Sequence, residues 1–244
     1  MHTKRILAQF SLVLVCIIAG TNVYAADLTG KNRDRNALRN HLWTTLGQPE
    51  KVSTAAENGK KLTRFCNTCH GENGISKNPW EANLAEQDPT YLLDQLINFA
   101  TKKRRNLVMN DLTPKFTDTE LVDITVYYSS MKNNYLPTHV NPKQVQIGKT
   151  IYQATCARCH GVTGKDIKGF ANLSGQSREY LTRSIEKFQV GRLRSSSVMG
   201  PIVANLSDPE IDALASYISV MSLRFDNNKG QIQNRQINQT TNSR

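Results

Sequence analysis

The sequence predicts an all-α fold built from two tandem copies of one small domain. The pentad Cys-x-x-Cys-His occurs twice, and its copies start 90 positions apart, at Cys66 and Cys156. Helix-start signals lie at the same offset, at Thr117 and Ser207. No stretch shows the regular alternation typical of a half-buried strand. Because similarity at a fixed period indicates a repeated structural unit, we divide the chain into two equivalent halves.

Residues 1–25 have the pattern of a secretory signal peptide. Lys4 and Arg5 precede an apolar run over residues 6–20, and Val23-Tyr24-Ala25 is a small-residue cleavage site. The run is shorter than the roughly 20 residues that cross a bilayer, so an uncleaved membrane anchor is the alternative. The pattern predicts export to the periplasm. The four cysteines that remain in the mature chain all lie in the pentads.

Residues 26–53 form a basic N-terminal segment. Within it, Leu38, Leu42 and Leu46 recur at helical spacing, with Trp43 beside them. This spacing predicts a short amphipathic helix that docks on the first domain.

The two domains are expected over residues 54–131 and 144–225. In each, one helix ends in the pentad, beginning near Ala55 or Val145, and a second covers about residues 89–102 or 177–190. A last helix follows a capping box, in which a hydroxyl side chain and a glutamate three residues on cap the N-terminus. Residues 132–143, which contain several Asn and Pro, read as a linker. Residues 226–244 are rich in Asn and Gln and are expected to be a disordered polar tail.

Each pentad predicts one covalently attached haem c. The thiols of Cys66 and Cys69, and those of Cys156 and Cys159, are spaced to add to the two vinyl groups of one haem. The histidine that follows is then held under the iron as an axial ligand. The expected cofactors are therefore two haem c groups, and the expected iron ligands include His70 and His160.

Other readings of Cys-x-x-Cys fit the sequence less well. A zinc ribbon places its two pairs roughly 15–20 residues apart, whereas Cys69 and Cys156 are 87 positions apart. A thioredoxin-like pair would lie among alternating strands and helices, and a local disulfide would leave the histidine unexplained. None of these alternatives requires a histidine directly after the second cysteine in both copies.

Two methionines are the expected second axial ligands. Met109 and Met199 each lie 39 residues after the pentad histidine, in what we expect to be a loop before the last helix. The thioether is a recognised haem ligand. Met131 and Met221 also repeat, but their helical spacing indicates core filling. His41 and His139 have no counterpart in the other half and are interpreted as surface residues.

These residues resemble the di-haem cytochrome c4 family, in which two class I cytochrome c domains each surround one haem. The resemblance covers roughly residues 54–224. It is carried by Asn172-Leu173-Ser174-Gly175-Gln176, by Tyr180-Leu181 and by the approach to Met199. The first half matches more loosely, with Glu86 in place of a glycine and Lys102-Lys103-Arg104-Arg105 in place of a Gly-x-Arg turn. By analogy with the class, the Pro79 carbonyl would accept a hydrogen bond from His70, whereas the second half lacks such a proline.

The resemblance implies a periplasmic electron carrier, soluble or membrane-associated, between a quinol-oxidising complex and a terminal oxidase or reductase. An iron closed by histidine and methionine has no vacant position for substrate, which suits electron transfer and not an enzyme. The alternatives are a di-haem enzyme, either a peroxidase or a thiosulfate-oxidising cytochrome, and the cytochrome subunit of a periplasmic dehydrogenase.

The chain is strongly basic, with a formal net charge of +11. An exported haem protein is not expected to meet nucleic acid, so acidic redox proteins or anionic lipid head groups are the expected partners. Residues 102–105, and Arg192 with Arg194, lie shortly before Met109 and Met199. They are either ordinary solvated charges or a basic rim at each haem edge that steers acidic partners.

Overall fold

The computed structural model describes residues 33–137, 140–165, 167–191, 196–221, 224–226 and 231–233. The predicted signal peptide, His139, Arg192, Arg194 and most of the predicted tail lie outside these residues. Among the residues that are described, no helix is both long enough and apolar enough to span a bilayer.

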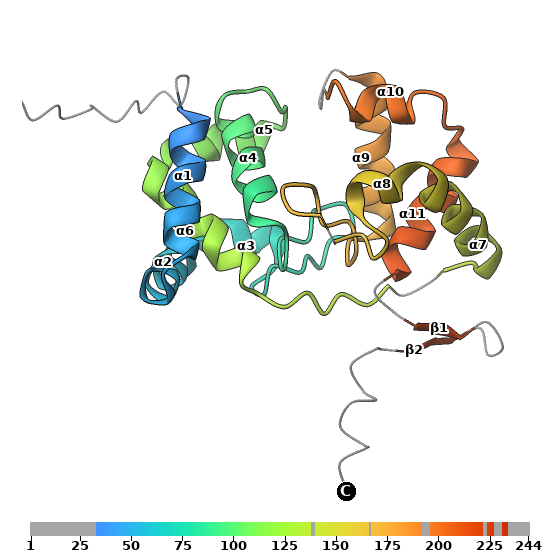
Figure 1. Cartoon of the computed structure of the whole chain (residues 1–244), viewed down its shortest axis with the longest axis horizontal. Coiled ribbons are helices and arrows are strands. Elements are labelled where there is room, and N and C mark those ends of the chain that lie inside the picture. The colour runs from blue at the N-terminus through green and yellow to red at the C-terminus, as the bar shows by residue number, and fades with distance from the viewer. Residues whose placement is uncertain are drawn as a thin grey trace, which may run out of the picture.

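The described chain is mostly helical and falls into two halves that lie side by side (Figure 1). The first half contains α1 (Arg35–Leu46), α2 (Pro49–Leu62), α3 (Arg64–His70), α4 (Pro89–Ala100), α5 (Leu107–Leu112), the 3-10 turn η1 (Thr113–Lys115) and α6 (Asp118–Ser129). The second contains α7 (Pro142–Ile151), the π-helical turn η2 (Tyr152–Cys156), α8 (Ala157–His160), α9 (Arg178–Val190), α10 (Met199–Val203) and α11 (Asp208–Val220). A short antiparallel hairpin, β1 (Arg224–Asp226) and β2 (Gln231–Gln233), follows, with Arg224 opposite Gln233. The predicted all-α fold is confirmed for the two halves.

The same helix crossing occurs in both halves: α2 packs on α6, and α7 packs on α11. A glycine lies at each crossing. A Cβ atom on Gly59 would lie 2.2 Å from the Asp123 carbonyl oxygen, and one on Gly148 would lie 1.9 Å from that of Ala213. Only glycine permits backbones to approach this closely.

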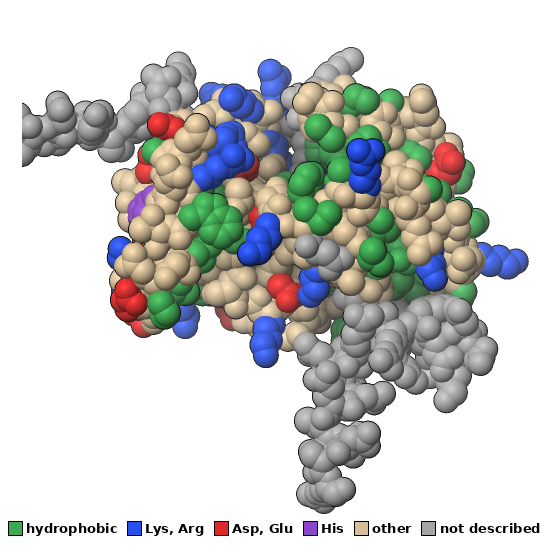
Figure 2. Space-filling model, viewed as in Figure 1, with side chains coloured by type: hydrophobic (Ala, Val, Ile, Leu, Met, Phe, Trp, Pro, Cys, Tyr) green, Lys and Arg blue, Asp and Glu red, His purple; other side chains and the backbone are tan. Residues whose placement is uncertain are grey.

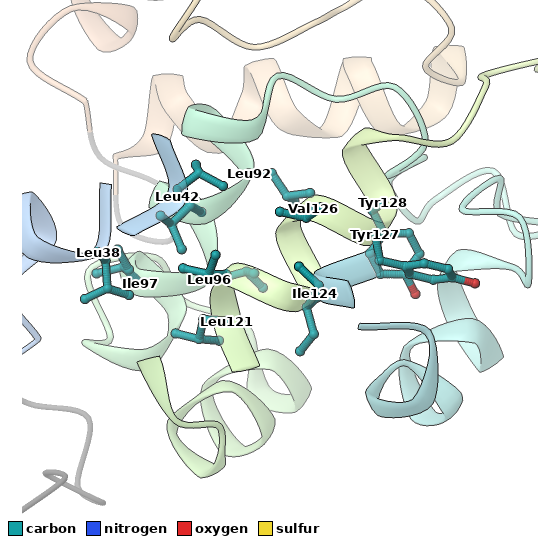
Figure 3. Close-up of a cluster of buried hydrophobic side chains, with 13 residues drawn as sticks. Leu38, Leu42, Leu92, Leu96, Ile97, Leu121, Ile124, Val126, Tyr127 and Tyr128 are labelled. Carbon is teal, nitrogen blue, oxygen red and sulfur yellow. The ribbon is translucent and has the colours of Figure 1, made fainter. Parts of the chain in front are cut away.

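Each half has its own apolar core. In the first, leucines of α1 and α4 pack against α6, and Figure 3 shows these side chains gathered near Leu96 and Ile124. In the second, Tyr152 of η2 is fully buried against α9 and α11. Met131 and Met221 pack against the edges of these cores, which confirms their predicted role as core fillers.

Helix α1 confirms the helix that was predicted in the N-terminal segment. Asp34 caps its first turn by accepting hydrogen bonds from two backbone N–H groups. Leu38 and Leu42 are buried in the first core. Arg35 and Arg39 both form ion pairs with Asp94 of α4, which hold the exposed side of α1 in place.

The predicted capping boxes are present at Thr117 and Ser207. Two other details of the prediction are wrong. The helix before the first pentad begins at Pro49 and not near Ala55, because proline is favoured at the first helical position. Met109 and Met199 lie in the short helices α5 and α10, and not in loops.

The halves meet through two equivalent loops, residues 83–87 and 172–176. Six hydrogen bonds join them, in two matching sets of three. In one set, the Asn83 N–H donates to Gln176 Oε1 (3.0 Å), Gln176 Nε2 to the Asn83 carbonyl (2.6 Å) and Asn83 Nδ2 to the Gly175 carbonyl (2.7 Å). In the other, the Asn172 N–H donates to Gln87 Oε1 (2.6 Å), Gln87 Nε2 to the Asn172 carbonyl (2.9 Å) and Asn172 Nδ2 to the Glu86 carbonyl (2.6 Å). Equivalent residues therefore exchange equivalent contacts across the interface.

Candidate haem cavity

Each pentad lies at the C-terminal end of a short helix. Helix α3 ends at His70 and α8 at His160, and the glycine that follows each has a positive φ, 76° at Gly71 and 78° at Gly161. This conformation favours glycine. The histidine is therefore the last residue of each helix, and the glycine after it allows the chain to change direction.

All four pentad cysteines are free thiols. Burial raises the pKa of the Cys66 thiol, and it raises that of Cys156 to about 11. Both thiols pack against the edges of the two cores, where they are partly enclosed.

The pentad histidines are held in one tautomer. His70 Nδ1 lies 2.8 Å from the Ala82 carbonyl oxygen, and His160 Nδ1 lies 3.0 Å from that of Ala171. Because a carbonyl oxygen can only accept, Nδ1 carries the proton and Nε2 carries the lone pair that a metal would bind. Burial also lowers the pKa of His70, which favours the neutral ring.

The expected role of Pro79 is wrong. Its carbonyl accepts a hydrogen bond from the Ser177 hydroxyl of the other half, and Ala82 accepts from His70 instead. Ala82 and Ala171 occupy equivalent positions, 89 residues apart. In both halves the acceptor for the histidine is therefore the backbone carbonyl of an alanine, and no proline is required.

One cavity of about 820 Å³ spans both halves. Its lining includes all eight predicted site residues: Cys66, Cys69, His70, Met109, Cys156, Cys159, His160 and Met199. Apolar side chains of both cores, such as Leu96 and Ile218, complete the walls. Thiols, histidines with a lone pair on Nε2, thioethers and apolar walls are the groups that a covalent haem requires, so the residues present fit this cofactor.

Arg104, one of the basic residues singled out in the sequence, lines the cavity. The Arg104 guanidinium lies 4.5 Å from the centre of the Phe99 ring, donates to Gln95 Oε1 (3.0 Å), and reaches across the interface to the Tyr180 hydroxyl (3.2 Å). Lys187 also lines the cavity, and burial together with the nearby arginines lowers its pKa. The departure from a Gly-x-Arg turn at residues 102–105 was the available signal in the sequence.

Comparison with known proteins identifies the family. Residues 145–222 match the family model for cytochrome c. Cytochrome c4 of Thiocapsa roseopersicina is 31% identical over 176 residues, which cover 66% of this chain and 90% of that protein. The chain belongs to the cytochrome c4 family. Cytochrome c4 of Pseudomonas aeruginosa is 31% identical over 198 residues, covering 75% and 98% of the two chains.

Solved structures support the same assignment. Reduced recombinant cytochrome c4 from Pseudomonas stutzeri matches with a TM-score of 0.60 and 30% identity, covering 67% of this chain and 96% of that one. The predicted class I cytochrome c fold and the predicted haem c cofactors are thereby confirmed. The chain is a c-type cytochrome, and its class of activity is electron transport.

Proposed function

We propose that this cytochrome c4 is a periplasmic electron carrier between a quinol-oxidising complex and a terminal oxidase or reductase. The observation that carries the proposal is the repetition of one complete set of candidate ligands, two thiols, a histidine in one tautomer and a methionine, around one cavity. Each bound haem supplies one-electron redox chemistry. The residues of the chain bind it, orient it and exclude water.

Each half is assigned the same roles. Cys66 and Cys69 anchor one haem, and Cys156 and Cys159 anchor the other. His70 and His160 present Nε2 as the proximal ligand, because Nδ1 is occupied by a carbonyl. We assign Met109 and Met199 as the second axial ligands, since both line the cavity at the edges of the cores. With a histidine and a methionine both bound to each iron, neither half would offer a substrate a place at the metal.

The first half also carries a candidate docking surface for an acidic redox protein. Lys102, Lys103 and Arg105 are exposed, and so are Leu107 and Val108 at the start of α5. Figure 2 shows Lys and Arg side chains gathered over the end of this half where α1, α4 and α5 meet. Exposed apolar side chains beside a basic group suit a partner with an acidic rim and an apolar centre.

A second candidate partner is a thiosulfate-oxidising enzyme. A thiosulfate dehydrogenase electron acceptor from Thiomonas intermedia is 27% identical over 176 residues, covering 65% of this chain and 79% of that protein. A thiosulfate dehydrogenase from Marichromatium purpuratum matches structurally with a TM-score of 0.59 and 25% identity, but this chain covers only 39% of it. This similarity favours accepting electrons from such an enzyme over catalysing the oxidation itself.

A redox titration followed by visible and near-infrared spectroscopy tests the proposal. We expect two low-spin haems per chain and the near-infrared charge-transfer band of methionine bound to ferric iron. A high-spin, water-ligated ferric haem without that band would contradict it. If the wild-type protein instead turned over thiosulfate or peroxide at enzymatic rates, the result would support the enzyme alternative.

A further inference from the structure

The peptide group between Ala82 and Asn83 links the proximal histidine of the first half to the second half. Its carbonyl accepts the hydrogen bond from His70 Nδ1 (2.8 Å). Its N–H donates to Oε1 of Gln176 (3.0 Å), which belongs to the second half. A single rigid peptide plane thus connects a predicted iron ligand to a side chain of the other domain.

The second half contains the same link in the opposite direction. The carbonyl of the Ala171–Asn172 peptide group accepts from His160 Nδ1 (3.0 Å), and its N–H donates to Oε1 of Gln87 (2.6 Å), in the first half. Each half therefore supplies a glutamine to the peptide group behind the other half's pentad histidine.

Both glutamines are held in place by a second contact. Gln176 Nε2 donates back to the Asn83 carbonyl (2.6 Å), and Gln87 Nε2 donates back to the Asn172 carbonyl (2.9 Å). These paired bonds fix the amide orientation, since the carbonyl requires the NH₂ group. Gln87 and Gln176 are only 6% and 4% exposed, so water does not compete for the peptide N–H.

Hydrogen bonds at the two ends of a peptide group reinforce each other. A bond accepted from the N–H polarises the carbonyl, and this effect is strongest where water is excluded. A more polarised carbonyl is a better acceptor for Nδ1–H, and a stronger bond at Nδ1 makes the ring a more basic metal ligand. A more basic ligand stabilises ferric over ferrous iron and lowers the reduction potential.

We propose that Gln176 and Gln87 are crossed positioning residues: each tunes the haem of the opposite domain through the peptide group behind its proximal histidine. Gln176 acts on the haem bound by His70, and Gln87 acts on the haem bound by His160. The inference rests on the ligand assignment of the proposed function.

The test is the potential of each haem in the holoproteins Gln176→Leu and Gln87→Leu, with the two haems assigned by NMR. In Gln176→Leu we expect the potential of the His70 haem to rise by more than that of the His160 haem. In Gln87→Leu we expect the reverse. Equal shifts at both haems, or a larger shift at the haem of the mutated domain, would overturn the proposal.

Asn133→Ala is the matched control. It removes another hydrogen bond across the interface, from Asn133 Nδ2 to the Gly175 carbonyl (3.1 Å), but touches neither linking peptide group. We expect no crossed shift in this variant. A crossed shift of the same size would show that loosening the interface, and not the glutamine contact, is responsible.

A second measurement reads the hydrogen bond directly. In the diamagnetic ferrous protein, the Nδ1 proton of His70 should move upfield in Gln176→Leu, while that of His160 stays in place. Where leucine prevents folding, Gln176→Asn, which is shorter by one methylene, gives the same comparison. If both haems are low-spin and methionine-ligated but neither substitution shifts the haem of the opposite domain, this inference alone is rejected. If the methionine ligation is absent, the proposed function is rejected.

Discussion

His70 and Ala82 are joined by a hydrogen bond of 2.8 Å from Nδ1 to the carbonyl oxygen, and this bond commits the ring to the tautomer with a free Nε2. His160 and its equivalent alanine repeat the arrangement. Because both histidines are held in this way, the proposed function depends on the methionine expected on the other side of each haem.

Met199→Ala should open the second iron. We expect a high-spin ferric haem with water as its sixth ligand, loss of about half of the near-infrared methionine band, and a lower potential, since methionine opposite histidine raises the potential. Visible and near-infrared spectra check this. Met221→Leu is the control, because Met221 packs on the core edge and its replacement should leave the spectra unchanged. An unchanged band in Met199→Ala would contradict the assignment.

Gly148→Ala should destabilise the protein by about 2 kcal/mol or more, because the new methyl group would collide with the backbone of Ala213 and force α7 away from α11. Urea unfolding of the holoprotein measures the change. Gly47→Ala serves as the control: its Cβ would meet its nearest atom at 3.4 Å, and the expected change is within about 0.5 kcal/mol. Equal effects at the two glycines would rule out this view of the helix crossing.

The interface loops allow a comparison of equivalent positions. Gly175 has φ of 81°, and a Cβ there would lie 2.5 Å from Asn133 Nδ2, so Gly175→Ala should cost about 1–3 kcal/mol. Glu86, its counterpart, has φ of 58° and already carries a Cβ. Glu86→Ala loses only the half-exposed ion pair with Lys165, and it should change stability by less than about 1 kcal/mol. Thermal unfolding of both variants decides; a larger loss in Glu86→Ala would contradict the prediction.

The docking surface predicts a charge-dependent reaction rate. Lys103→Glu with Arg105→Glu should slow electron transfer with an acidic partner about tenfold or more at low salt, and the rate of the unaltered protein should fall as salt increases. Stopped-flow mixing measures both. Lys60→Glu with Lys61→Glu, which changes the same net charge at the end of α2, should have a much smaller effect. A rate that is insensitive to salt would eliminate the steering surface.

The burial of the Asp123 carboxyl group leads us to expect that the stability of the protein depends on pH. Burial raises the pKa of this carboxyl group above its usual range. The folded state therefore binds a proton more readily than the unfolded chain, so this group favours folding at low pH and the contribution is lost as pH rises through the folded pKa. In urea unfolding from pH 4 to pH 7, the stability of Asp123→Asn should increase relative to that of the unaltered protein as the pH rises. Parallel profiles would show that Asp123 does not titrate in this range.

Local patterns account for what could be predicted from the sequence. The pentads and the capping boxes at Thr117 and Ser207 depend on residues a few positions apart, and the structure has both. The acceptor of His70 could not be predicted in this way, because the path of the loop that places Ala82 behind the ring is set by tertiary contacts. The roles of Gln87 and Gln176 were equally hidden, since a polar side chain gives no local sign that its partner lies in the other half.

The six hydrogen bonds between the loops have a consequence for assembly. Residue 83 contacts residue 176 in the same way as residue 172 contacts residue 87, so the two patches are equivalent and complementary to each other. Reciprocal contacts of this kind are typical of a two-fold symmetric homodimer. Here the two partners belong to one polypeptide, so their contact is intramolecular and forms at a high effective concentration. The covalent connection therefore keeps the two loops paired at any concentration of the protein.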